Sequence, residues 1–251
     1  HRFRRRRGLL GRRDNFGGRT AKKSAGGRRL RAGIVYSGGV SKCAYQIGFT
    51  KALLDRSDRA VVTAASGASM GMFTAYAASS GKMDELEALY RDINIGRKAQ
   101  LFWQVFAKNM LLEMIDAFLD VRDELHIPVF FPISYIPVFS VRYYELLGKF
   151  NPVWEKYMNA ASNFPFLKVF PNFLNHRFAI DGGATDNIPL YPLLRTRQDG
   201  NGAFDVIFVL HFDTRYDWRR DFVTDVPVID LDVSYCNDFS KNHFDFSENY
   251  I

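Results

Sequence analysis

Gly67-Ala68-Ser69-Met70-Gly71 is the stretch of this chain that says most about its fold. It follows an apolar run, Ala60–Ala65, and it precedes small residues with helical spacing, Met70–Ala78. A serine in the pattern Gly-x-Ser-x-Gly between a strand and a helix stands on a sharp turn, and the flanking glycines leave it room. The N-terminal N–H groups of the helix then point at any oxyanion that develops there. We therefore predict that Ser69 is a nucleophile; capping of the helix by its hydroxyl is the alternative.

The sequence around this motif repeats one pattern of apolar run, glycine turn and helical segment. Upstream, the apolar run Ala32–Tyr36 leads through a turn into Lys42–Leu54, whose apolar residues have helical spacing. This repetition predicts an α/β domain with a parallel sheet. Later apolar runs predict three more strands, of which the last two should be covered on both faces: Phe178–Ile180, Val206–Phe212 and Val226–Val233.

The middle of the chain is predicted to be largely helical. Apolar spacing indicates helices over Met83–Ile93, over roughly Ala99–Leu125 and over Pro152–Ala161. Val129–Phe139 is apolar but contains prolines, which leaves both a strand and an irregular loop open.

A second glycine turn, Ser37–Lys42, lies between the first predicted strand and its helix. Backbone N–H groups in such a turn can point together into an anion-binding concavity. The dinucleotide pattern Gly-x-Gly-x-x-Gly is absent, and Lys42 does not have the spacing of a phosphate-binding loop. An oxyanion hole therefore fits this turn better than a nucleotide site.

Four segments of the chain resemble the patatin-like phospholipases and occur in that family's order. They are an opening glycine signature, the nucleophile turn, an Ala-Ser-x-x-x-Pro segment and an Asp-Gly-Gly block, at 37–48, 67–71, 160–165 and 178–189. The resemblance implies a three-layer α/β/α fold around a central, mostly parallel sheet. It implies that Ser69 attacks an ester carbonyl to form an acyl-enzyme, with Asp181 as the only base. The accompanying motif glycines are Gly67, Gly71, Gly182 and Gly183.

The same resemblance assigns the oxyanion hole to Gly38, Gly39 and Val40. The family usually has glycine where Val40 and Cys43 stand. If Val40 needed a positive φ, its β-branched side chain would be costly, so we expect an altered hole. A weakened or inactive lipid-binding or scaffolding protein of the same fold is therefore an alternative, as is an acyltransferase that uses the same residues.

An exposed aspartate is a poor base for a serine hydroxyl, because its pKa is near 4. Burial after the apolar strand would raise the pKa of Asp181 and suit it to the role. Asp186 is the second candidate, although a turn or capping role is more usual for it. A Ser–His–Asp triad would need a histidine after Asp181, and only His211 and His243 qualify. His211 lies within an apolar run, where a satisfied strand-end histidine is the ordinary interpretation.

The expected substrate is a phospholipid or another acyl-ester lipid met at a membrane surface. Apolar residues of the helix between Leu101 and Leu119 and of Val129–Phe139 could line an acyl channel or dip into a membrane, or simply pack in the core. No cofactor is implied: no histidine pair has zinc spacing, and no calcium-loop spacing occurs.

Charge divides the chain into two parts. Residues 1–32 contain 13 Lys or Arg and one acid, whereas the rest contains 21 basic and 26 acidic residues. We predict a basic, disordered tail over 1–31, either an electrostatic anchor or a plain linker, and a hydrolase domain over 32–251 whose C-terminus is truncated. No specific nucleic acid is expected as a partner. Two cysteines and the lack of a secretory signal are compatible with a cytoplasmic protein, with or without peripheral attachment to membranes.

Overall fold

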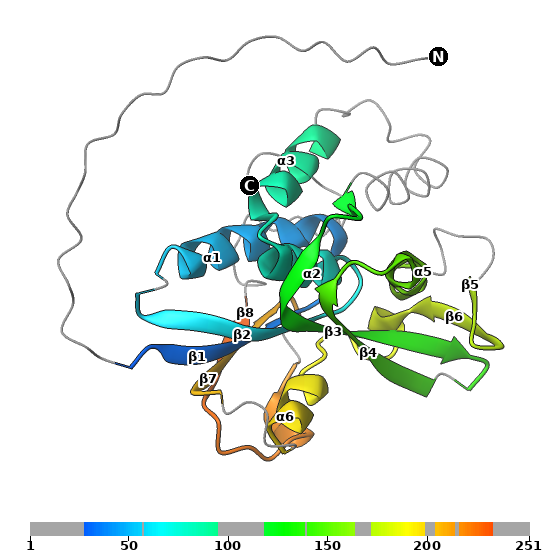
Figure 1. Ribbon diagram of the computed structural model, residues 1–251. Helices are drawn as coiled ribbons and strands as arrows, with labels where there is room; N and C mark the ends of the chain where they lie inside the picture. The colour runs from blue at the N-terminus through cyan, green and yellow to red at the C-terminus, as the bar shows by residue number, and fades with distance from the viewer. Residues whose placement is uncertain are drawn as a thin grey trace, which may run out of the picture.

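The computed structural model describes residues 28–56, 58–94, 118–138, 140–163, 172–198, 204–213 and 216–232 (Figure 1). Its elements follow in the order β1 (Leu30–Tyr36), η1 (Val40–Cys43), α1 (Ala44–Leu54), β2 (Ala60–Gly67), α2 (Met70–Ser80), α3 (Met83–Asn94), β3 (Glu124–Ile136), β4 (Ser140–Lys149), α5 (Pro152–Ala161), β5 (Asn172–Leu174), β6 (Arg177–Asp181), η2 (Gly182–Ala184), α6 (Tyr191–Gln198), β7 (Val206–His211), η3 (Trp218–Arg220) and β8 (Val228–Asp232).

The strands form one eight-stranded sheet in the order β5-β6-β3-β2-β1-β7-β8, with β4 paired to β3. The five strands β3, β2, β1, β7 and β8 run parallel to one another. β4, β6 and β5 extend this sheet through antiparallel pairs. Strand–helix–strand crossovers account for the parallel half, as the repeated sequence pattern predicts.

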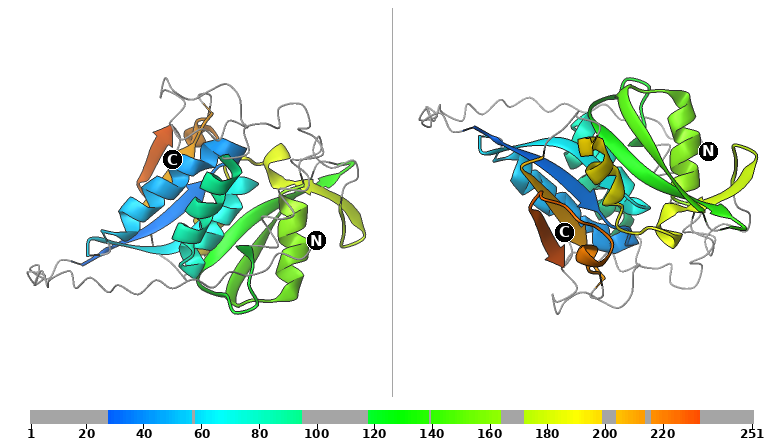
Figure 2. Two further views of the ribbon diagram at one scale, coloured as in Figure 1. Left: turned by 90° about the horizontal axis from the view of Figure 1, so that it is seen from above. Right: turned by 90° about the horizontal axis from the view of Figure 1, so that it is seen from below.

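Helices cover both faces of the parallel half (Figure 1). α1, α2 and α3 lie on one face, and α6 lies on the other; the views from above and below in Figure 2 show the same separation. Side chains along β1 alternate accordingly: Ile34 and Tyr36 belong to the core under α1 and α2, while Val35 belongs to the core under α6. The predicted three-layer α/β/α arrangement with a mostly parallel central sheet is thus confirmed.

Most predicted elements occur within a few residues of their expected bounds, and α5 matches its prediction, Pro152–Ala161. Val129–Phe139, left open between strand and loop, belongs mainly to β3. The helix predicted to continue to Leu125 is wrong at its end, because a turn follows Phe118 and β3 begins at Glu124; residues 95–117 lie outside the described part.

The prediction that β8 is covered on both faces is wrong. It is the last strand of the described sheet, and its residues are half-buried or exposed. Its apolar residues therefore pack on β7 from the edge. Among the described residues, no helix combines the length and apolar character needed to cross a membrane.

Candidate active site

Ser69 occupies the sharp turn between β2 and α2. Its backbone has φ 51° and ψ −126°, a conformation that residues with a Cβ rarely adopt. A Cβ on Gly67 would lie 2.4 Å from the carbonyl oxygen of Gly71, and a Cβ on Gly71 would lie 2.6 Å from that of Tyr36. The Ser69 hydroxyl makes no capping hydrogen bond to α2. The turn thus presents a half-buried hydroxyl that does not cap the helix.

β3 brings Asp181 to the same place. One edge of β3 pairs with β4, and along the opposite edge β2 and β6 follow each other. β2 runs parallel to β3 and pairs Ser66 with Phe130, whereas β6 runs antiparallel and pairs Asp181 with Ile133. The carboxyl ends of β2 and β6 therefore meet head-on, across a gap of roughly 10 Å along β3. Ser69 and Asp181 come from the two sides of this gap.

The Asp181 side chain is almost fully buried, with 1% of the residue exposed. Burial raises its pKa to about 6, while the neighbouring Ser69 hydroxyl and the Gly183 N–H act in the opposite direction. Oδ1 accepts a hydrogen bond from the Gly183 N–H at 2.7 Å. Oδ2 has no partner of normal hydrogen-bond geometry in the described structure, so the contact with Ser69 is looser than a standard hydrogen bond. Catalytic contacts are often loose before substrate binds.

The glycines after Asp181 hold this carboxylate against the sheet. A Cβ on Gly182 would lie 2.1 Å from the carbonyl oxygen of Pro132 on β3. A Cβ on Gly183 would lie 3.1 Å from Asp181 Oδ1, where the hydrogen-bonding N–H now approaches. Gly182 is therefore required by a close backbone contact, whereas Gly183 leaves room for side-chain oxygens of Asp181 and Asn187.

The turn after β1 differs from the predicted oxyanion hole. The Gly38 N–H donates to Asn187, at 3.1 Å to Oδ1 and 3.3 Å to the carbonyl oxygen, so it is occupied rather than free. The N–H groups of Gly39 and Met70 have no backbone partner within the part of the chain that the structure describes, although the Gly39 N–H also approaches the Cys43 thiol. Met70 is the first residue of α2, where N–H groups lack helical partners. Met70, and to a lesser degree Gly39, thus have N–H groups that are less occupied than that of Gly38.

The positions where the chain departs from the family pattern are accommodated locally. Val40 begins η1, and the φ angles of a 3-10 helix are negative, so the expected strain does not arise. Cys43 is buried under the turn, with its Sγ 3.6 Å from the carbonyl oxygen of Ser37. Gln46 donates to the same oxygen at 2.9 Å and helps to fix the turn.

Asp186 and His211, the two alternative candidates for the base, have other partners. Asp186 Oδ2 accepts from the Tyr143 hydroxyl at 2.6 Å, and Oδ1 accepts from the Ile188 N–H at 3.2 Å. His211 is 1% exposed; its Nδ1 accepts from the Asp213 N–H at 3.2 Å and its Nε2 contacts Asp230. Both ring nitrogens of His211 therefore contact residues other than Ser69 and Asp181.

Two other predicted segments fall partly outside the described residues. In the Ala-Ser-x-x-x-Pro segment, the carbonyl oxygen of Asn163 accepts from the Asp181 N–H at 2.9 Å, so this segment lies beside the base; its last two residues are not described. Of the helix predicted between Leu101 and Leu119, Phe118 is buried against Phe73 and Tyr76. The described C-terminal end of this predicted helix therefore packs in the core.

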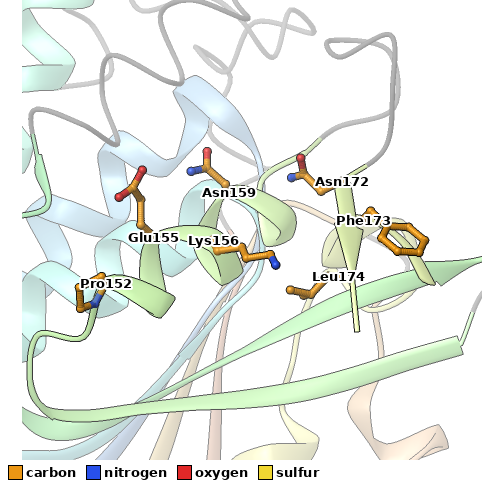
Figure 3. Close-up of a pocket in the computed structure, with 7 residues that line it drawn as sticks. All are labelled: Pro152, Glu155, Lys156, Asn159, Asn172, Phe173 and Leu174. Atoms are coloured by element: carbon orange, nitrogen blue, oxygen red, sulfur yellow. The ribbon is translucent and has the colours of Figure 1, made fainter. Parts of the chain in front are cut away.

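Two cavities lined by described residues lie apart from the candidate pair. One, of about 440 Å³, opens between α5 and β5 and is lined by Pro152, Glu155, Lys156, Asn159, Asn172, Phe173 and Leu174 (Figure 3). Asn159 Oδ1 and Asn172 Nδ2, on the two facing elements, are buried there and have no hydrogen-bond partner among the described residues. The other, of about 580 Å³, borders the Lys82–Asp123 ion pair. The described residues form no cluster of three or more metal-ligating side chains.

Comparison with known proteins assigns no family. No family model matches the chain, and no curated protein matches it. Among solved structures, the chain is similar to VipD from Legionella pneumophila, with a TM-score of 0.45 and 14% sequence identity over 76% of this chain and 51% of that one. The chain thus spans about half the length of that protein.

Proposed function

We propose that this protein hydrolyses carboxylic esters of lipids through a Ser69–Asp181 dyad. The observation that carries the proposal is the meeting of a strained serine turn with a buried aspartate whose pKa is raised to about 6. A serine needs a neighbouring base to become nucleophilic, and a carboxylate with a pKa near the working pH is suited to that task. No histidine among the described residues contacts either member of the pair.

In the proposed reaction, Ser69 Oγ attacks the ester carbonyl while Asp181 takes its proton. The N–H groups of Gly39 and Met70, with the positive end of the α2 dipole, stabilise the oxyanion. Asp181 then returns the proton to the departing alcohol and leaves an acyl-enzyme on Ser69. A water molecule, deprotonated by Asp181, attacks this ester; Ser69 Oγ recovers the proton as the fatty acid leaves.

A lipid surface as the source of substrate is supported by one sheet face that no described helix covers. α5 packs on one face of the antiparallel extension, whereas Ile136, Phe178 and Phe173 lie across neighbouring strands on the opposite face. Phe173 is 58% exposed and Phe178 50%, and their rings are 5.6 Å apart. This face borders the base loop, because the hydroxyl of Thr185 bonds that of Ser134 at 2.7 Å.

Lipid binding without hydrolysis is the second candidate. It is favoured by the Gly38 N–H, which is occupied by Asn187 instead of being free for an oxyanion. Acyl transfer to an alcohol would use the dyad in the same way and differs only in the acceptor.

The test is the release of fatty acid from phospholipids, lysophospholipids and triglycerides, together with covalent labelling by a fluorophosphonate. We expect activity and labelling in the wild type, neither in Ser69→Ala, and a large loss of activity in Asp181→Asn. His126→Ala, an exposed position on β3, is the matched control and should behave as wild type. Lipid binding without labelling would favour the second candidate, and ester products formed with an added alcohol would indicate acyl transfer.

A further inference from the structure

Asn187 connects the two halves of the candidate active site. Its Oδ1 accepts from the Gly38 N–H at 3.1 Å, and its Nδ2 donates to the Gly38 carbonyl oxygen at 3.2 Å. The side-chain amide therefore pairs with both polar groups of Gly38, much as one strand residue pairs with its neighbour. Asn187 belongs to the loop that follows Asp181, so these bonds tie the base loop to the turn after β1.

The packing around this amide places it next to the nucleophile. A Cβ on Gly38 would lie 2.6 Å from Asn187 Oδ1 and 2.9 Å from the Cβ of Ser69. A Cβ on Gly183 would lie 2.7 Å from the same Oδ1. Asn187 Oδ1 thus fills the space that two glycines leave open, one from each motif.

We propose that Asn187 is a positioning residue that sets the oxyanion hole of the Ser69 site. Its Nδ2 holds the Gly38 carbonyl, which belongs to the same planar peptide group as the Gly39 N–H, so the bond fixes the direction of that N–H. Asn187 touches no reacting atom in this role and transfers no proton. The inference rests on the proposed hydrolase function and adds a requirement for a neutral amide at this position.

That requirement separates positioning from simple structural support. Asn187→Asp keeps the shape and the acceptor for the Gly38 N–H, but its carboxylate repels the Gly38 carbonyl oxygen and the charge that develops beside Ser69. A purely structural role would make the loss of activity follow the loss of stability in both variants. A positioning role makes Asn187→Asp at least as damaging to kcat as Asn187→Ala, beyond any loss of stability.

The experiment compares Asn187→Ala and Asn187→Asp with Asn175→Asp, the same change in the β5–β6 turn, where Asn175 bonds the Tyr144 hydroxyl at 3.1 Å. Hydrolysis of p-nitrophenyl butyrate and the rate of fluorophosphonate labelling are measured, with thermal unfolding as the check on folding. We expect Asn187→Ala to lower kcat roughly 10- to 100-fold with KM within about twofold, and Asn187→Asp to lose as much or more. The pH midpoint of the remaining Asn187→Ala activity should stay where the wild type has it.

Two results overturn the inference alone: wild-type labelling rates in both Asn187 variants, or an Asn187→Asp protein that is clearly more active than Asn187→Ala. Absence of labelling at Ser69 in the wild type overturns the proposed function, and the inference falls with it. If Asn187→Ala does not fold, the isosteric Asn187→Asp protein decides the question by comparison with Asn175→Asp.

Discussion

Ser69 holds a backbone conformation that costs free energy, because at φ 51° and ψ −126° its Cβ crowds the backbone. The turn persists because β2 and α2 on either side are well packed. Replacement by glycine relieves the strain, whereas replacement by alanine retains it. We expect Ser69→Gly to be more stable than Ser69→Ala by about 1 kcal/mol, after allowance for the greater flexibility of glycine in the unfolded chain. Urea unfolding measures the difference; equal stabilities would mean that the turn is not strained.

In the proposed reaction Asp181 must be ionised to accept the serine proton, and its pKa is raised to about 6 by burial. The hydrolysis of p-nitrophenyl butyrate should therefore rise with pH, with a kcat/KM midpoint near 6, and level off above pH 7. A rate profile from pH 4.5 to 8.5 measures this midpoint. A midpoint near 4 would mean that Asp181 is solvated in solution, and it would remove the physical basis for its role.

The raised pKa also means that ionised Asp181 lowers the stability of the folded protein. The folded protein binds this proton more tightly than the unfolded chain, whose aspartates have a pKa near 4, so stability falls as the pH rises from about 4 to about 6. Asp181→Asn removes the buried charge. It should be more stable than wild type by up to about 3 kcal/mol at pH 8 and by less at pH 5. Urea unfolding at both pH values tests this, with Asp58→Asn, at an exposed turn, as the control that should show no such gain.

Gly182 illustrates how one element can set the geometry of another. A Cβ at this position would lie 2.1 Å from a backbone oxygen of β3, so the end of β6 would have to move away from the sheet. We expect Gly182→Ala to lose about 2 kcal/mol of stability and roughly 100-fold in kcat. Gly48→Ala is the matched control: nothing lies within 4 Å of its added Cβ in α1, and it should be stabilised by about 0.5–1 kcal/mol. Similar behaviour of the two variants would contradict the contact with β3.

Elements with strong local signals could be predicted from the sequence. α5 begins where Pro152 follows a capping residue, Asn151, whose side chain accepts from the Val153 N–H at 3.0 Å. β4 was not predicted, because its residues lack clear alternation and its stability comes from a long antiparallel pairing with β3. β5 is only three residues long and exists through its pairing with β6. Such pairings depend on distant partners, which local patterns do not contain.

The candidate site also contains residues that could be predicted from the local sequence and contacts that could not. Ser69 could be predicted from a local motif, and Asp181 depended on the family resemblance. The bond between Asn187 and Gly38 could not be predicted, because it follows from the register of β6 on β3 and of β2 on β3, which is set by packing throughout the sheet. The occupied Gly38 N–H is therefore visible only in the folded chain.

Under the proposed function, the protein would meet its substrate on the face of the antiparallel extension that no described helix covers. Phe173 and Phe178 are exposed there, and the turn between β5 and β6 carries the exposed residue His176, whose ring lies 6.4 Å from that of Phe173. Exposed aromatic side chains are typical of surfaces that settle at the headgroup level of a bilayer. The face also borders the loop of Asp181, so a protein docked in this way holds its base loop near the lipid.

Replacing both phenylalanines by serine should therefore weaken sedimentation with vesicles of phosphatidylcholine and phosphatidylglycerol, by about tenfold in affinity, because roughly 1.5 kcal/mol of apolar burial is lost. Hydrolysis of soluble p-nitrophenyl butyrate should stay within about twofold of wild type, since neither ring touches the candidate pair. The control replaces Val223 and Ile229, which are also exposed but lie in and near β8, and should leave binding unchanged. Binding is measured in the Ser69→Ala background, so that vesicles remain intact. Equal losses in both double variants would show that apolar exposure in general, and not this face, drives the association.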